Sequence, residues 1–272
     1  MLAASVSFSV PKAGNAPSEN DDACHQGYGG TRRISRQHQP LQRRHGRHLR
    51  FAVADGASEG ILTGMWARVL VDSFCHHGVP CLRAEDHLEL AWREWGTQRK
   101  AYLEAREKNG QPIRWYEEPG LAAGASAAFL GLTVAESRDV LHGSWQAIAA
   151  GDCCLFQVRG DQLVACFPVE QSVRFDNYPS LASSNPERRD VSLRAYSGRR
   201  GYWRAHDRFY LTTDALAAWF LGQHEHGLRP WLRLQDLHGP QSDQRFEWLV
   251  SELRASRQIR NDDVTLVAVE MG

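Results

Sequence analysis

The sequence lacks an excess of charge of either sign, because lysine plus arginine and aspartate plus glutamate each number 32. Balanced charge gives no reason to expect a nucleic-acid-binding protein or one held on a membrane surface. No apolar run has the length of a membrane span, and the first residues carry neither the basic segment nor the apolar core of a signal peptide. We therefore expect a cytoplasmic protein with no nucleic-acid or membrane partner.

The sequence also lacks paired cysteine motifs. Its six cysteines have neither CxxC spacing nor the density of a disulfide-stabilised scaffold. Cys153 and Cys154 are adjacent, so their side chains are expected on opposite faces of a strand. Reduced thiols are therefore expected, which agrees with a cytoplasmic location.

Acidic residues, in contrast, stand at the ends of apolar, strand-like segments along nearly the whole chain. The motifs are Asn20-Asp21-Asp22-Ala23, Phe51-Ala52-Val53-Ala54-Asp55-Gly56, Ala150-Gly151-Asp152, Phe209 to Ala215 with Asp214, and Asn261-Asp262-Asp263 before Val264. A buried carboxylate needs a cation, a hydrogen-bond donor or water. If several converge, they form an all-oxygen site of the kind that Mg²⁺ and Mn²⁺ prefer.

The order and spacing of these motifs resemble the PPM family, the metal-dependent Ser/Thr protein phosphatases also called protein phosphatase 2C, and its bacterial members in particular. That family carries an Asn-Glu-Asp-like element, an Asp-Gly turn, a Gly-Asp strand, a Thr/Ser-Asp-Gly strand end and a terminal Asp-Asn/Asp-x-Thr strand. All have counterparts here in the same order, from about residue 5 to the C-terminus. The resemblance implies an α+β fold, a four-layer α-β-β-α sandwich of two antiparallel sheets flanked by helices, in a single domain over residues 1–272.

The resemblance also implies a set of metal ligands. Asp55 would bridge two Mn²⁺ or Mg²⁺ ions, and the carbonyl oxygen of Gly56 would bind one of them. Asp214 and Asp262 would complete the other site. For a single aspartate such as Asp214, a helix cap or turn is the commoner role, and only the joint occurrence of the motifs favours a metal site.

Further acidic residues would take part in catalysis. By the same resemblance, Asp21 would hold metal-bound water and Asp22 would orient that water. Asp152 would bind a third ion together with Asp214, or would bond only to backbone or solvent, and both interpretations stay open.

The sequence departs from the family where substrate phosphate is bound. Family members often place an arginine a few residues before the first acidic element, and Pro17 stands at that position here. Lys12 is the cation nearby, so we expect it to contribute to phosphate binding. The glycine that follows the family's Thr/Ser-Asp is replaced by Ala215.

The function that the resemblance implies is hydrolysis of phosphoserine or phosphothreonine on proteins by attack of a metal-bridging hydroxide. The implied partner is a phosphorylated protein, with a Ser/Thr kinase acting in opposition within a signalling system, and the chain is expected to be a monomer. Two alternatives stay open. One is a catalytically weak PPM-fold regulatory module that binds a phosphorylated partner, and the other is a hydrolase of small phosphoesters, because a fold and its metals do not select the substrate.

Hydrophobic periodicity predicts the secondary structure. Predicted strands cover 5–10, 122–134, 145–158, 163–167, 208–212 and 264–271. Predicted helices cover 61–75, 85–108, 215–222 and 242–255, the last capped by Ser242. Residues 27–50 are expected to form an exposed basic loop, either simply solvated or attracting phosphorylated substrate. Residues 170–206 are expected to be irregular and, by resemblance, to form a flap-like insertion beside the active site.

Overall fold

The computed structural model describes residues 3–28, 48–57, 60–76, 83–136, 141–175, 179–237 and 239–272. Its strands form two antiparallel sheets. The first has the order β1-β11-β10-β6-β7, with β1 (Ala3–Val10), β6 (Cys154–Arg159), β7 (Gln162–Phe167), β10 (Arg208–Thr212) and β11 (Val264–Met271). The second has the order β2-β3-β4-β5-β9, with β2 (Ala23–Tyr28), β3 (His48–Gly56), β4 (Ser126–Glu136), β5 (His142–Ala150) and β9 (Tyr196–Arg204), and β8 (Ala182–Ser183) pairs with β4.

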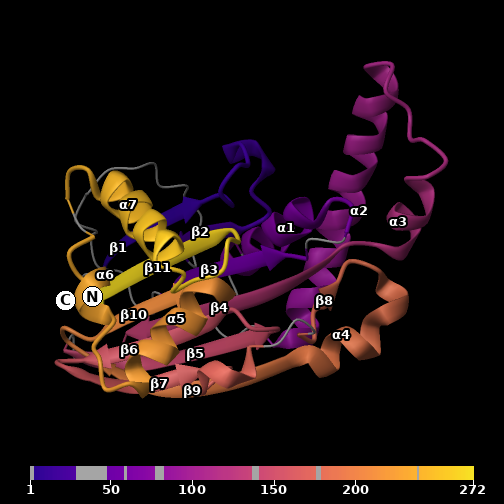
Figure 1. Ribbon diagram of the computed structural model, residues 1–272. Helices are drawn as coiled ribbons and strands as arrows, with labels where there is room; N and C mark the ends of the chain where they lie inside the picture. The colour runs from indigo at the N-terminus through magenta and orange to yellow at the C-terminus, as the bar shows by residue number, and fades with distance from the viewer. Residues whose placement is uncertain are drawn as a thin grey trace.

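Helices cover the outer face of each sheet (Figure 1). On the first sheet lie α5 (Asp214–Glu225), α6 (Trp231–Leu234) and α7 (Ser242–Ala255), and on the second lie α1 (Thr63–His76) and α2 (Ala84–Lys108). Short connections contain α3 (Glu118–Ala123), α4 (Arg189–Ala195) and three single turns at Pro17–Glu19, Ser172–Arg174 and Pro186–Arg188. The expected four-layer α-β-β-α sandwich is confirmed. Within the described residues, no helix is both long and apolar enough to cross a membrane.

The core consists of three apolar layers, one between the sheets and one under each set of helices. Strand alternation assigns neighbouring side chains to different layers, because successive residues of a strand point to opposite faces. Cys153 lies in the layer between the sheets, whereas Cys154 lies in the layer under α5 with Phe156, whose ring stacks on Phe220 at 4.0 Å. The predicted opposite orientation of the two cysteines is therefore confirmed.

The prediction of one strand over residues 145–158 is wrong. The chain forms β5 in the second sheet and β6 in the first, and it crosses between the sheets at Gly151, whose φ of +83° favours glycine. A Cβ at Gly151 would also lie 2.7 Å from the Cβ of Ala128. The crossing places Asp152 at the end of both sheets.

The prediction that residues 170–206 are irregular is also wrong at its C-terminal end. Strand β9 pairs with β5 from Tyr196 opposite Ala150 to Arg204 opposite His142. It lies at the edge of the second sheet and is mostly exposed, so its residues are polar and the hydrophobic pattern that marks a central strand is missing. Trp203 is the fully buried exception.

One arginine of the predicted basic loop is a core residue. Arg50 lies in β3 and is fully buried, with its Nη1 donating to the carbonyl oxygen of Phe74 at 3.0 Å. The hydrogen bond and the Phe74 ring, 5.7 Å from the guanidinium carbon, replace the water that an exposed arginine would have. Residues 29–47, which hold most of the predicted loop, lie outside the described residues.

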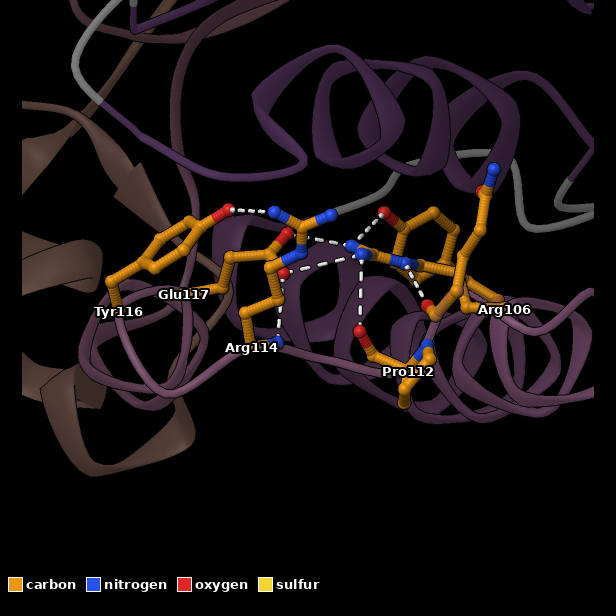
Figure 2. Close-up of polar contacts among 7 residues, drawn as sticks. Arg106, Pro112, Arg114, Tyr116 and Glu117 are labelled. Carbon is orange, nitrogen blue, oxygen red and sulfur yellow. Dashed lines mark hydrogen bonds and ion pairs between the residues drawn. The ribbon is translucent and has the colours of Figure 1, made fainter.

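Helix α2 projects beyond the sheets, and Arg106 near its end fixes the segment that returns toward them (Figure 1). The guanidinium of Arg106 binds both carboxylate oxygens of Glu117, at 2.6 and 3.2 Å, and donates to the carbonyl oxygens of Gln111 and Pro112 (Figure 2). Hydrogen bonding from Arg106 lowers the pKa of Glu117. The chain held in this way continues through α3 into β4.

We predict that Gly131→Ala destabilises the protein. A Cβ at this position of β4 would lie 2.6–2.8 Å from three ring atoms of Phe74 in α1. Overpacking of this kind lowers the free energy of unfolding by about 1–3 kcal/mol. The control Gly96→Ala, in exposed helix with nothing within 4 Å, should instead raise it by about 0.5–1 kcal/mol. Urea denaturation measures both, and a neutral Gly131→Ala would contradict the packing of α1 on β4.

Candidate metal centre

The acidic residues expected at the site lie at the ends of strands that meet at one end of the sandwich. Asp21 and Asp22 precede β2, Asp55 and Gly56 end β3, Asp152 lies between β5 and β6, Asp214 follows β10, and Asp262 precedes β11. Burial raises the pKa of Asp55 well above its usual value, and the charges of Asp22, Asp214, Asp152 and Asp262 raise it further. Carboxylates from separate parts of the chain therefore lie close enough to affect one another's pKa.

Asp21 forms hydrogen bonds with three distant parts of the chain. Its N–H donates to Oδ2 of Asp263 at 2.8 Å, and its carbonyl oxygen accepts from the N–H of Gly56 at 3.3 Å. Its Oδ1 accepts from the N–H of Gly64, in the first turn of α1, at 3.2 Å. A Cβ at Gly64 would lie 2.8 Å from that same oxygen, so glycine permits the approach.

Asp22 is buried and is positioned by a threonine pair. The hydroxyl of Thr213 donates to its Oδ2 at 3.1 Å, and that hydroxyl accepts from the N–H of Thr265 at 2.9 Å. The other oxygen of Asp22, Oδ1, is buried with no hydrogen-bond partner. Burial raises the pKa of Asp22 well above its usual value, and Asp263 and Asp214 add to the effect.

Asp214 is the first residue of α5, and Thr213, which precedes it, has the N-cap position without a capping side-chain bond. Its Oδ2 forms an ion pair with Nη2 of Arg260, while its Oδ1 is buried with no hydrogen-bond partner. Burial raises the pKa of Asp214, although the charge of Arg260 and a hydrogen bond from Ala215 act in the opposite direction. The carboxylate of Asp214 therefore already has a cationic partner.

The remaining predicted residues have simpler surroundings. Asp152 is buried and Asp262 is half-buried. Gly56 leaves no room for a side chain, since a Cβ there would lie 2.8 Å from the carbonyl carbon of Thr63. Lys12 is exposed, and its backbone N–H donates to Oδ1 of Asp263 at 2.6 Å. Whether these residues bind metal or phosphate stays a prediction.

Sequence reasoning missed three residues of this site. Asp263 accepts hydrogen bonds from the backbone of Asp21 and Lys12, Thr213 orients Asp22, and Arg260 pairs with Asp214. Asp263 and Thr213 lie within two of the acidic sequence motifs, so the sequence could have predicted that they belong to the site. Arg260 carries no such signal, because its partner lies 46 positions away in the sequence.

A divalent ion fits these residues. Two carboxylate oxygens, Asp22 Oδ1 and Asp214 Oδ1, are buried without a hydrogen-bond partner, and several carboxylates raise one another's pKa. Ionised groups in such a place need a compensating positive charge. The donors are all oxygen atoms, which suits Mg²⁺ or Mn²⁺ better than softer metals.

Two other patterns have the spacing of nucleophilic hydrolase motifs. Residues 56–60 read Gly-x-Ser-x-Gly, of which residues 58 and 59 lie outside the described residues. Strand β3, which ends at Gly56, runs antiparallel to both neighbours, unlike the strand before a nucleophile elbow in an α/β-hydrolase. Cys153 and Arg159 have Cys-x5-Arg spacing, but Cys153 precedes β6 and Arg159 is the last residue of that strand, so no loop joins them. The Cys153 thiol is fully buried and burial raises its pKa, so a thiolate nucleophile is disfavoured.

No family model matches the chain, and no curated protein matches it in sequence. Solved structures do match it over nearly all of its length. The Mycobacterium tuberculosis serine/threonine phosphatase PstP/Ppp has a TM-score of 0.54 at 15% identity, with 100% of this chain and 99% of that chain covered. The catalytic domain of PstP in complex with two manganese ions gives 0.52 and 15%, with 98% and 97% covered. A bacterial serine phosphatase gives 0.54 and 12%, with the same coverage. The chain has the PPM-type phosphatase fold.

The PPM-type fold explains why the acidic residues lie close together. Each carboxylate lies where a strand of one of the two stacked sheets begins or ends, and these strand ends meet because the sheets are packed face to face. The expected fold is thus confirmed, and the carboxylates expected from the sequence lie together in it.

We predict that Asp55→Asn raises the Tm of the metal-free protein. The pKa of Asp55 is higher in the folded protein than the ordinary 3.8, so ionisation costs stability; this cost grows as the pH rises above the unfolded-chain pKa and is complete above the folded-state pKa. An increase of about 2–4 °C corresponds to removal of about 1 kcal/mol in a domain of this size class. Differential scanning fluorimetry in excess chelator measures it.

The difference should disappear as the pH falls below the unfolded-chain pKa, where Asp55 is neutral in both states. Added Mn²⁺ should reverse the order of the two proteins, since wild type binds the ion more tightly. Asp236→Asn, an exposed change, is the control and should leave Tm unchanged. A lower Tm for Asp55→Asn in chelator would contradict the electrostatic strain inferred at this site.

Proposed function

We propose that this chain is a metal-dependent phosphatase that hydrolyses phosphoserine and phosphothreonine on proteins. The observation that carries the proposal is the convergence of Asp22, Asp55, Asp152, Asp214 and Asp262 at one end of a PPM-type fold. The structure of PstP with two manganese ions supports the choice of metal. Mn²⁺ or Mg²⁺ would supply an activated water molecule and neutralise charge on the transferred phosphoryl group.

In this proposal Asp55, the carbonyl oxygen of Gly56, Asp214 and Asp262 hold two ions, and Asp152 with Asp214 holds a third. The all-oxygen donor set and the unpartnered Oδ1 of Asp214 support the assignment. Several carboxylates of one charge sign would otherwise repel one another, so ion binding and folding of this end of the sandwich are coupled.

Asp21 and Asp22 orient the attacking water. Thr213 fixes one oxygen of Asp22 and leaves its Oδ1 available as a hydrogen-bond acceptor. Asp21 is held through its own backbone and through Oδ1 to Gly64, so its carboxylate has a defined direction. Positioning of this kind reduces the entropy lost in reaching the transition state.

Arg260 is the cation that we assign to the substrate phosphate, in place of the arginine that Pro17 replaces. Its guanidinium pairs with Asp214, its side chain is 48% exposed, and an arginine can bind two phosphate oxygens at once. An ion bound at Asp214 would compete with the guanidinium for that carboxylate. Lys12 stays the alternative, because its backbone contacts the same region.

The wider setting belongs to the same proposal. The substrate is a phosphorylated protein in a signalling system, a Ser/Thr kinase acts in opposition, and the chain works as a monomeric single domain in the cytoplasm. Five cysteines in the described residues are free thiols, which supports a reducing compartment. A regulatory module of low activity and a hydrolase of small phosphoesters remain the competing functions.

We predict Mn²⁺- or Mg²⁺-dependent phosphate release from a phosphothreonine peptide. Chelator should abolish this activity. Asp55→Asn, Asp214→Asn and Asp262→Asn should each lower kcat by more than about 100-fold, because loss of a residue that only hydrogen-bonds a metal ligand already lowers activity by roughly 10–100-fold. Thr213→Val, which removes the hydrogen bond that positions the water-orienting Asp22, should reduce kcat less than the three ligand variants do. Asp236→Asn is the control for exposed charge and should retain full activity.

The competing functions give different results in the same assay. Binding of the phosphopeptide without turnover would favour the regulatory module, and turnover of p-nitrophenyl phosphate without turnover of peptides would favour the small-phosphoester hydrolase. Full activity in excess chelator, or full activity in two of the three ligand variants, would overturn the metal mechanism.

We predict that Arg260→Ala raises KM for phosphopeptide by about 10–100-fold, in line with the free energy of a hydrogen bond to a charged group. The increase should shrink at high salt, and Arg260→Lys should restore part of the affinity. Lys12→Ala is the comparison. If Lys12→Ala changes KM and Arg260→Ala does not, the phosphate is bound by the lysine instead.

A further inference from the structure

The geometry points to a second metal site, for a transition-metal ion, formed by His25, Asp72 and His76. One ligand atom from each residue lies within 4.8 Å of the other two. His25 Nδ1 is 2.9 Å from Asp72 Oδ1, and the two imidazole rings are 4.6 Å apart between centroids. These residues are distinct from the aspartates of the candidate metal centre and do not depend on the proposed phosphatase function.

Two secondary-structure elements hold the three side chains. Asp72 and His76 are four residues apart in the last two turns of α1, so they share one face of that helix. His25 belongs to β2, against which α1 packs. The Sγ of Cys75 contacts the carbonyl oxygen of His25 at 3.5 Å, which fixes the strand against the end of the helix.

The donor set suits a different ion from the all-aspartate centre. Two imidazoles and one carboxylate are ligands of Zn²⁺ and neighbouring transition metals, whereas Mg²⁺ prefers oxygen donors alone. His76 Nδ1 lies 2.9 Å from the carbonyl oxygen of Asp72. If that nitrogen donates its proton to the carbonyl, Nε2 carries the lone pair that a metal requires.

The electrostatic surroundings of the three residues favour a cation, although one nearby charge opposes it. The site lies at the C-terminal end of α1, where the helix dipole is negative and favours a cation, and Asp72 adds a full charge. Arg50 acts against it, because its guanidinium binds the carbonyl oxygen of Phe74 in the same turn. The side chains of His25 and Asp72 are 31% and 44% exposed, so an ion can reach them from solvent.

An ion at this position would join β2 and α1, the two elements next to Asp21. Strand β2 begins directly after Asp22, and the first turn of α1 donates from Gly64 to Asp21. A metal bridge between the other end of α1 and β2 would restrain both elements together. The expected result is a more stable fold at this end of the second sheet.

The test is equilibrium dialysis of the untagged full chain against micromolar Zn²⁺, with excess Mg²⁺ present throughout, followed by measurement of bound zinc. Wild type should bind one more Zn²⁺ per chain than His25→Ala and His76→Ala, and its Tm should rise with Zn²⁺ more than theirs. In the Co²⁺-loaded protein, the visible absorption of histidine-ligated cobalt should be lost in both variants. Circular dichroism checks that each variant is folded.

The matched control is His226→Ala. His226 also ends a helix and also places Nδ1 near the carbonyl oxygen of the fourth preceding residue, Gly222, but it is not part of the cluster. Its zinc content and Tm shift should equal those of wild type. If His25→Ala does not fold, the exposed His76 decides the question alone. Equal zinc content in wild type and His76→Ala would show that His25 and Asp72 form an ion pair only, and would overturn the site.

Discussion

Repulsion among carboxylates gathered in a buried place is the constraint on which this end of the molecule depends. Burial and the charges of four other aspartates raise the pKa of Asp55, and Asp22 and Asp214 each retain an oxygen without a hydrogen-bond partner. Such a group of ionised side chains is unfavourable unless positive charge compensates it. The fold therefore places carboxylates where bound cations would stabilise them.

The stacking of two antiparallel sheets brings these residues together. The acidic residues lie at the ends of several strands, and no single segment of the chain contains the whole set. Close backbone approach completes the arrangement, because Gly56 and Gly64 lie against atoms that a Cβ would meet at 2.8 Å. The chain crosses between sheets at Gly151, which delivers Asp152 to the same end. Backbone geometry, as much as the acidic side chains, thus defines the centre.

Two kinds of positive charge suit this region. Arg260 pairs with Asp214, and divalent ions suit the remaining oxygens. In the proposed function, the guanidinium of Arg260 would contact substrate phosphate and so take the place of the arginine that Pro17 replaces. On the other end of α1, imidazole donors replace oxygen donors, so the proposed second site would select a different metal without competing for the first.

Much of the fold and most of the acidic site could be predicted from the sequence. Apolar segments ending in aspartate predicted several of the strands, because a buried strand needs a continuous apolar pattern and only its ends can carry charge, and the order of the acidic motifs carried the resemblance that implied the site. The edge strand β9 was missed, since its exposed residues are polar and only pairing with β5 makes it a strand. Arg50 was misplaced for a related reason, because sequence does not reveal the carbonyl of Phe74 that satisfies it.

The sequence by itself therefore determined which residues are acidic, where strands end and which broad fold can bury the apolar segments. Only the tertiary structure decided which of those residues meet. The hydrogen bond between the N–H of Asp21 and the carboxylate of Asp263 spans 242 positions of the sequence. The His25–Asp72 contact joins β2 to α1, although β3 lies between these two elements in the sequence. Contacts at such separations depend on how sheets stack and helices pack, and hydrophobic periodicity records burial without recording the partner.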